Sequence, residues 1–336
     1  MKYEASNPGF NYYGRWHVAG IATTLNSGAL VEFAYTGSAC KLDFDVTGFT
    51  FFPAVFVQVD NGPVSQATLS ASAAQVEVRP QFNEFPIGSP PFANISSKHH
   101  LVRFWIAANS LYQTQAAGTQ WSGLNGGCQF IGASIRDGGL MRLPYATRQI
   151  EFLGDSITQG LRLLYTGEDD DTNLQRPYMN WPQLVADLLG SKPIVNGFGG
   201  QGLTIEGTCG VPVAQNAFPF IYNDIRWRPP VKPLVAVIYY GVNDSVSTSE
   251  FGGLYSTYLS TVTSAYADAR IFAICPHGKP DYASAIQKAA ATFPKVLFLD
   301  YSLGIISGDE TCDGCHLNPG GAVKLAATLA ADIQKE

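Results

Sequence analysis

The chain has 336 residues, of which 46% are hydrophobic and 14% charged, and its formal net charge is −6. This length and apolar content suffice for a large core and favour two domains over one. The small share of charge, without any basic stripe, argues against a nucleic acid partner, and no apolar run is long enough to span a bilayer, so a membrane is not expected either.

The N-terminal segment, "MKYEASNPGF", lacks the hydrophobic core of a signal peptide. A chain poor in charge and rich in glycine is nevertheless typical of many exported proteins. We therefore expect a secreted or periplasmic protein whose signal has been removed, with the cytoplasm as the alternative.

The first part of the chain, to about residue 146, has the pattern of antiparallel β-structure. Residues 41–48, "KLDFDVTG", alternate apolar and polar side chains, and residues 55–63, "VFVQVDNGP", do so before an Asp-Asn-Gly turn signal. The same alternation recurs over residues 29–37, 74–80, 101–109 and 128–139. These short strands predict an all-β jelly-roll or sandwich domain over residues 1–140.

From residue 148 onward, apolar strands alternate with helix-length segments. The expected strands cover residues 150–154, 192–196, 234–241, 269–276 and 295–302, and the expected helices include residues 181–190, 281–293 and 319–336. Strands that are apolar on both faces and alternate with helices predict a parallel sheet covered on both sides, hence an α/β three-layer domain over residues 148–336. Residues 138–148 are the expected linker.

In such a sheet the ligand crevice lies beyond the carboxyl ends of the strands. The first strand ends in "GDS", which places Ser156 at the start of a helix, where backbone N–H groups favour negative charge. Alone, this serine would be read as an ordinary helix N-cap. The second strand, however, runs into "NGFGGQG" and the third into "YYGVNDS", so glycine N–H groups and the Asn243 amide are expected at the same edge.

Near the C-terminus, "TCDGCHLNPGG" allows two interpretations. Cys312, Cys315 and His316 match the C-x-x-C-H attachment site of a c-type haem. Asp313 and His316 match the acid and base of a hydrolytic triad, in which the carboxylate would hold Nδ1–H while Nε2 faces a serine.

The blocks "GDSI", "GGQG", "GVND" and "DGCH" resemble, in order and spacing, the four blocks of the SGNH (GDSL-like) hydrolases. The resemblance implies a flavodoxin-like catalytic domain with Ser156 as nucleophile, His316 as base and Asp313 as its orienting acid. It also implies an oxyanion hole formed by the Ser156 N–H, the Gly200 N–H and the Asn243 side chain. The glycine block lies one residue closer to the second strand than expected, which favours Gly200 over Gly202.

A β-sandwich before such a domain is similar to the two-domain acetyl esterases of carbohydrate esterase family two. "YYGRW" (12–16) and "SKHHLVRFWIAA" (97–108) resemble the N-terminal domain of that family, although less specifically than the catalytic blocks do. The resemblance implies an acetylated polysaccharide or oligosaccharide as substrate.

The haem interpretation is the weaker one, because a C-x-x-C-H motif needs only local residues and leaves Ser156, Gly200 and Asn243 without a role. Cys312 and Cys315 are then either a disulfide or two thiols. A zinc site is not favoured, since no second pair of metal ligands is evident. The lack of a G-x-S-x-G motif also argues against an α/β-hydrolase.

We therefore expect a serine esterase that removes O-acetyl groups from carbohydrate through an acyl-serine intermediate, with no metal or organic cofactor. The alternatives are a lipase, thioesterase or aryl esterase on the same scaffold, and a carbohydrate-binding protein that has lost turnover. Trp181 and Trp227 lie near the catalytic blocks and could stack on sugar rings, but aromatic residues are more often part of the core.

Overall fold

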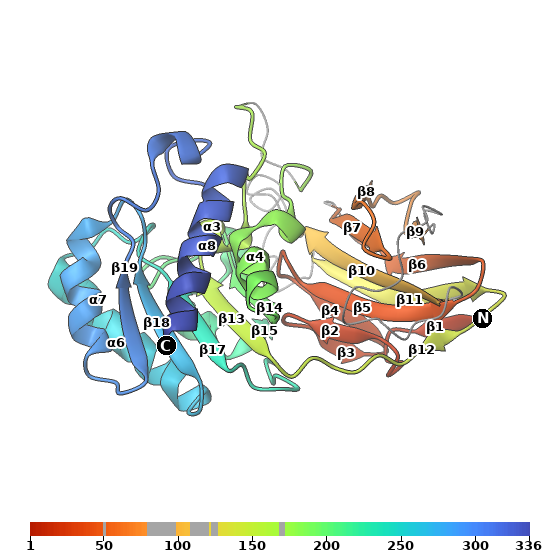
Figure 1. Cartoon of the computed structure of the whole chain (residues 1–336), viewed down its shortest axis with the longest axis horizontal. Helices are drawn as coiled ribbons and strands as arrows, with labels where there is room; N and C mark the ends of the chain where they lie inside the picture. The colour runs from red at the N-terminus through yellow and green to blue at the C-terminus, as the bar shows by residue number, and fades with distance from the viewer. Residues whose placement is uncertain (50–51, 79–98, 108–120, 122–126, 168–171) are drawn as a thin grey trace.

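The structure is a computed structural model of the chain and describes residues 1–49, 52–78, 99–107, 121, 127–167 and 172–336. Two lobes lie side by side (Figure 1). The β-sheets of the N-terminal part, in red to yellow, adjoin a mixed lobe of helices and strands, in green to blue. No helix in the described ranges combines the length and apolar character that crossing a membrane requires.

The N-terminal lobe contains two antiparallel sheets. One has the order β3-β4-β11-β6-β9, with β1 paired to β11, and the other has the order β12-β5-β10-β7-β8, with β2 paired to β5. The strands of the first sheet are β1 (Lys2–Glu4), β3 (His17–Ala19), β4 (Ile21–Thr24), β6 (Ala39–Asp45), β9 (Gln75–Val78) and β11 (Cys128–Arg136). Those of the second are β2 (Asn11–Tyr13), β5 (Leu30–Thr36), β7 (Ala54–Val59), β8 (Ser65–Thr68), β10 (His99–Ala107) and β12 (Leu140–Met141).

The core of this lobe lies between the two sheets. Phe44, Phe104 and Phe130 contact one another edge to face or tilted, with ring centroids 5.0–6.0 Å apart. Strand β6 keeps the predicted alternation, since Leu42 and Phe44 are buried in this core. Strand β7 is buried on both faces instead, because Phe56 packs against Tyr178 of the second lobe, which adjoins that face.

The second lobe is built on a five-stranded parallel sheet of order β14-β13-β17-β18-β19. Its strands are β13 (Gln149–Gly154), β14 (Lys192–Gly197), β17 (Val235–Tyr239), β18 (Arg270–Cys275) and β19 (Val296–Asp300). A separate hairpin joins β15 (Phe220–Tyr222) and β16 (Ile225–Arg226). The helices are α3 (Ser156–Gln159), α4 (Trp181–Leu188), α5 (Ala214–Ala217), α6 (Thr248–Ala265), α7 (Ala283–Ala290) and α8 (Pro319–Lys335).

Helices cover both faces of this sheet. On the central strand β17, Ala236 and Ile238 pack with the apolar side chains of α6 and α7, whereas Val237 and Tyr239 pack with those of α4 and α8. Consecutive residues of a strand point to opposite faces, so a sheet buried on both sides needs the continuous apolar runs seen in the sequence. The predicted fold class, a flavodoxin-like α/β three-layer unit after an all-β sandwich, is confirmed.

The two lobes share buried polar contacts. Arg15, in the loop after β2, is fully buried and reaches Glu151 of β13, with Nε and Nη2 lying 3.0 and 2.8 Å from the same carboxylate oxygen. Its Nη1 donates to the carbonyl oxygens of Phe218 and Phe220, at 2.7 and 2.8 Å. The motif "YYGRW" therefore contains a residue that joins the sandwich to the parallel sheet.

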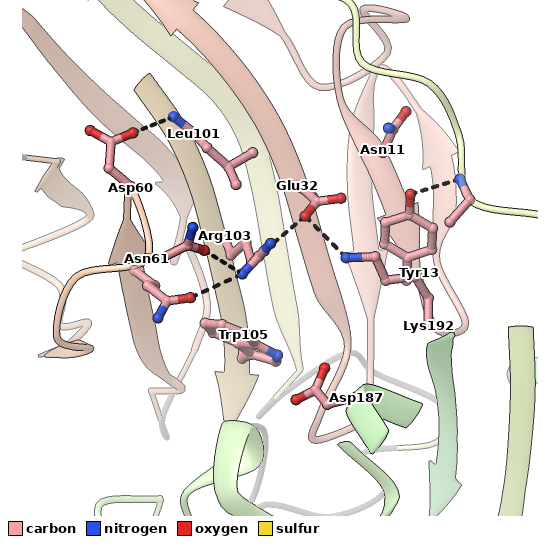
Figure 2. Close-up of polar contacts among 12 residues, drawn as sticks. Asn11, Tyr13, Glu32, Asp60, Asn61, Leu101, Arg103, Trp105, Asp187 and Lys192 are labelled. Carbon is pink, nitrogen blue, oxygen red and sulfur yellow. Dashed lines mark hydrogen bonds and ion pairs between the residues drawn. The ribbon is translucent and has the colours of Figure 1, made fainter. Parts of the chain in front are cut away.

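A second polar cluster bridges the lobes nearer the surface (Figure 2). Glu32 of β5 accepts hydrogen bonds from Arg103 of β10, at 2.8 Å, and from Lys192 of β14, at 3.0 Å. Burial alone would raise the pKa of Glu32, but the two cations lower it below its ordinary value. This cluster and the Arg15–Glu151 pair both connect the sandwich to the two parallel strands that lie nearest to it.

Candidate active site

Ser156 begins the short helix α3 directly after strand β13, as predicted. Asp155 caps this helix, because its Oδ1 accepts a hydrogen bond from the Ile157 N–H at 2.9 Å. Gly154 is required by the close packing of the turn, since a Cβ there would lie 2.1 Å from Thr158 Oγ1 and 2.9 Å from the Tyr239 carbonyl oxygen. Asp155, and not Ser156, is therefore the N-cap of this helix.

Ser156, His316 and Asp313 come together in one chain of hydrogen bonds. Ser156 Oγ lies 2.9 Å from His316 Nε2, and His316 Nδ1 lies 2.7 Å from Asp313 Oδ2. A carboxylate can only accept, so Nδ1 carries the ring hydrogen and Nε2 of the neutral imidazole is left to accept the serine proton. The arrangement can remove the proton from a hydroxyl nucleophile.

Asp313 also shapes the loop that carries the histidine. Its Oδ1 accepts hydrogen bonds from the backbone N–H groups of His316, at 2.7 Å, and Cys315, at 3.1 Å. One carboxylate therefore holds both the ring of His316 and the backbone on which that ring is mounted.

Arg162 belongs to the same cluster and had no signal in the sequence. Its Nη1 lies 2.8 Å from Asp313 Oδ2, and its guanidinium lies over the Tyr165 ring, 4.8 Å from the centroid. Burial alone would raise the pKa of Asp313, but the hydrogen bonds from Arg162 and His316 hold that pKa well below its usual range. These contacts therefore favour the ionised form of Asp313.

The glycine block follows strand β14, whose carboxyl end lies beside that of β13. Gly200 adopts a φ of 72°, which favours glycine. The Gly202 N–H is donated to the Ile205 carbonyl oxygen at 3.0 Å, whereas no such acceptor takes the Gly200 N–H among the residues with described positions. This difference supports Gly200 over Gly202 as the oxyanion donor.

Asn243 and Asp244 hold the glycine block in place. Asn243 Nδ2 donates one hydrogen to the Gln201 carbonyl oxygen at 3.0 Å, which leaves its second hydrogen for another acceptor. Asp244 Oδ1 accepts from the backbone N–H and the hydroxyl of Thr204, at 2.8 and 2.7 Å. The third block thus orients the second.

Asp155 is a second carboxyl with a shifted pKa at this edge of the sheet. Burial raises its pKa to about 7, with a further contribution from Asp244. Its Oδ2 has no hydrogen-bond partner within the described part of the chain. The group is therefore largely protonated below neutral pH, next to the serine but without a contact to the serine hydroxyl.

The remaining candidates from the sequence take structural positions. Trp181 is fully buried, packs against Phe152 and Tyr239, and donates its Nε1–H to the Ile157 carbonyl oxygen at 3.1 Å. The prediction that it belongs to the core is confirmed. Trp227 is partly buried and packs under the guanidinium of Arg15, at the lobe interface.

The C-x-x-C-H residues lie in the loop before helix α8. Cys312 Sγ lies 3.3 Å from the carbonyl oxygens of Arg162 and His316, and the ring of His316 points to Ser156. No group of three or more His, Cys, Asp or Glu side chains with metal-site geometry occurs in the ranges that the structure describes. Every contact made by His316 fits the triad interpretation of the motif.

Comparison with known proteins agrees with these observations. The family model of the GDSL-like lipase/acylhydrolase family matches residues 152–323, which is more than half of the chain. No curated protein sequence is similar enough to match the chain.

Several solved structures have the same fold over nearly their whole length. An active-site mutant of a family two carbohydrate esterase from Clostridium thermocellum has a TM-score of 0.78 at 22% identity, over 98% of this chain and 99% of that one. A family two carbohydrate esterase from Cellvibrio japonicus has a TM-score of 0.79 at 18% identity, over 100% and 97%. An acetyl xylan esterase from the rumen bacterium Butyrivibrio proteoclasticus has a TM-score of 0.76 at 16% identity, over 100% and 98%. At these identities the likeness establishes the shared two-part fold.

Proposed function

The chain belongs to the GDSL-like lipase/acylhydrolase family, and on that premise we propose that it is a serine esterase that removes O-acetyl groups from carbohydrate. The observation that carries the proposal is the chain of hydrogen bonds from Ser156 through His316 to Asp313, at 2.9 and 2.7 Å. These distances lie within the range expected of a nucleophile, its general base and the group that orients the base.

In the proposed reaction, Ser156 Oγ attacks the ester carbonyl carbon while His316 Nε2 takes the hydroxyl proton. The tetrahedral intermediate collapses, the bond to the sugar oxygen breaks, and His316 returns the proton to that oxygen. The acetyl group remains on Ser156. Water, deprotonated by the same histidine, then attacks the acyl carbon. The bond from that carbon to Ser156 Oγ breaks, His316 returns the proton to Oγ, and acetate leaves.

The negative charge of the tetrahedral intermediate requires donors that are already in position. We assign this role to the backbone N–H groups of Ser156 and Gly200 and to the second amide hydrogen of Asn243. The contact from Asn243 to Gln201 and the turn at Gly200 support the assignment, because both hold these donors in place before substrate binds.

The choice of a carbohydrate ester as substrate depends on the two-part fold. The solved structures that share both parts include family two carbohydrate esterases, one of them in complex with cellohexaose, and an acetyl xylan esterase. We propose that residues 1–140 form an accessory sandwich domain and residues 148–336 the catalytic domain. An acetylated polysaccharide lies outside the cytoplasm, so the proposed location is secreted or periplasmic.

The experiment that tests the proposal is a screen for acetate release from defined acetylated oligosaccharides, with fatty acyl esters and thioesters as competing classes. We expect acetylated carbohydrates to give the highest kcat/KM, and Ser156→Ala to lower kcat by about 10⁴-fold or more. Ser302→Ala is a matched control, because Ser302 is a buried serine just beyond the carboxyl end of β19 whose Oγ donates to Asp300.

Two outcomes separate the alternatives. A purified protein that binds acetylated oligosaccharides but releases no acetate would be a binding protein and would contradict the esterase proposal. Higher kcat/KM on long acyl chains or thioesters would retain Ser156 as nucleophile but reject carbohydrate as the substrate class.

A further inference from the structure

A second histidine, His277, lies behind the catalytic loop and has no part in the triad. It follows strand β18, is 9% exposed, and is hydrogen-bonded through both ring nitrogens. Nδ1 lies 2.7 Å from the hydroxyl of Tyr239, the last residue of β17, and Nε2 lies 2.8 Å from the carbonyl oxygen of Cys315. The imidazole thus connects the carboxyl edge of the sheet to the residue directly before His316.

These partners determine which tautomer is present. A carbonyl oxygen only accepts, so Nε2 carries a hydrogen and donates it to Cys315. The neutral ring then accepts at Nδ1, and the hydrogen comes from the Tyr239 hydroxyl. That hydroxyl oxygen in turn accepts from the His277 backbone N–H, at 3.3 Å. Every hydrogen in this small network therefore has an acceptor when His277 is neutral.

The surroundings of His277 favour the neutral form. Burial lowers its pKa, and the nearby His316 lowers it further, whereas the contact with the Cys315 carbonyl raises it in part. Tyr239 is fully buried, and burial raises the pKa of its hydroxyl, so it remains a hydrogen-bond donor. A neutral His277 does not oppose the positive charge that His316 acquires during ester cleavage.

The catalytic loop is consequently held on two sides. Asp313 Oδ1 accepts the N–H groups of Cys315 and His316 from the solvent side. His277 Nε2 holds the Cys315 carbonyl from the sheet side. The peptide group between Cys315 and His316 thus has its carbonyl oxygen held by one side chain and its N–H by another, and this leaves little freedom for the backbone that aims His316 Nε2 at Ser156.

We propose that His277 is a positioning residue for the general base: through the Cys315 carbonyl it keeps the His316 ring within proton-transfer distance of Ser156. The inference rests on the proposed role of Ser156 as nucleophile. It extends that proposal to a residue outside the four sequence blocks, and it does not depend on which ester is the substrate.

The test measures the reaction of Ser156 with a fluorophosphonate, in which Oγ forms a bond to phosphorus, fluoride leaves and His316 takes the hydroxyl proton. This reaction reports on the serine–histidine geometry whatever the natural substrate is. His277→Leu removes both ring contacts at similar volume, and we expect it to lower the labelling rate and the kcat on an aryl acetate about 10- to 100-fold, because small displacements of catalytic groups have effects of this size. KM should change little, since ground-state binding is not affected.

Three further variants make the test specific. His277→Gln retains a side-chain N–H that can reach the Cys315 carbonyl, so it should recover most of the lost rate. Tyr239→Phe removes the hydroxyl that donates to Nδ1 and accepts the His277 backbone N–H, but it leaves the contact from Nε2 to Cys315, so it should lower the rate less than His277→Leu. Tyr301→Phe is the matched control, because Tyr301 is also buried beyond a strand end but its hydroxyl donates to Asp332 of α8.

The possible results distinguish the two proposals. Labelling of a folded His277→Leu protein at the parent rate would overturn the positioning role and leave the nucleophile intact. A Gln variant as slow as the Leu variant, with equal thermal stability, would overturn it too. Absence of labelling at Ser156 in the parent would overturn the proposed nucleophile, and with it this inference. If His277→Leu does not fold, the other variants decide the question. A labelling rate of Tyr239→Phe equal to that of the parent would then contradict the proposed network.

Discussion

The buried ion pair between Arg15 and Glu151 offers a sharp test of how the two lobes are held together. Both side chains are fully buried, and the guanidinium makes two hydrogen bonds to one carboxylate oxygen and two more to backbone carbonyls. Arg15→Met removes these contacts and leaves the Glu151 carboxylate buried without its counter-ion. Breaking a buried pair by removing one partner costs about 3–5 kcal/mol, so we expect a loss of this size in the free energy of unfolding.

The companion variant removes both charges. Arg15→Met/Glu151→Leu no longer buries an unpaired carboxylate, but it still leaves the carbonyls of Phe218 and Phe220 without their donor. We therefore expect the double variant to be more stable than the sum of the two single losses predicts, with a coupling of about 1–3 kcal/mol.

The assay is urea unfolding, followed by circular dichroism and by tryptophan fluorescence, for the parent, both single variants and the double variant. Coincidence of the two probes checks that the lobes unfold together. A loss below about 1 kcal/mol for Arg15→Met, or strictly additive losses in the double variant, would contradict the burial of this ion pair, since a solvated pair contributes little and couples weakly.

Other variants test the site itself. His316→Ala should be nearly as damaging as loss of the nucleophile, whereas Asp313→Ala should retain measurable activity, because Asp313 orients the ring and stabilises its charged form but takes no proton itself; kcat/KM on one aryl acetate measures both. Asn243→Ala should lower kcat about 10²–10³-fold through the lost oxyanion donor, with circular dichroism as the check on folding. Asp155→Asn tests the buried carboxyl, whose pKa is raised from 3.8 to about 7. Between these values the folded parent holds a proton that the unfolded chain has released, so the parent loses stability as pH rises. The asparagine variant keeps the cap and carries no charge. Between pH 5 and pH 8 its free energy of unfolding, measured in urea, should rise by roughly 2–3 kcal/mol relative to that of the parent. An equal pH dependence in both proteins would contradict the burial of this charge.

Much of the fold could be predicted because the two lobes follow different hydrophobic periods. The strands of the parallel sheet are continuous apolar runs. Each sequence block associated with the site comes after the carboxyl end of one of these strands, either directly or in the loop that follows. Parallel strands bring such positions together, so Ser156, Asn243 and His316 could be placed at one edge of the sheet without coordinates.

The elements that could not be predicted from the sequence show no hydrophobic periodicity of their own. Strands β1 to β3 have three residues each and are formed by pairing with neighbours, as when β2 pairs with β5. Helix α6 contains Gly252, Gly253 and many β-branched residues, which disfavour helices, and its stability comes from burying Phe251, Tyr255 and Leu259 against the sheet.

Side-chain partners across long sequence separations were equally out of reach. The contacts of Arg162 with Asp313 and of His277 with Cys315 join residues that no local pattern connects. Arg15 lies within a motif that resembled an N-terminal domain, but nothing in those residues indicated that its partner would be Glu151. Such links depend on how the loops and lobes pack, which the hydrophobic pattern does not encode.

The proposed mechanism requires a covalent acyl intermediate on Ser156, and this intermediate can be trapped. The protein is mixed with an excess of an aryl acetate, quenched in acid during turnover and digested, and the peptides are weighed by mass spectrometry. We expect one acetyl group on the peptide that contains Ser156, and none in the Ser156→Ala protein treated in the same way. Turnover with the acetyl group on a different side chain, or at the parent rate in Ser156→Ala, would contradict the proposed mechanism.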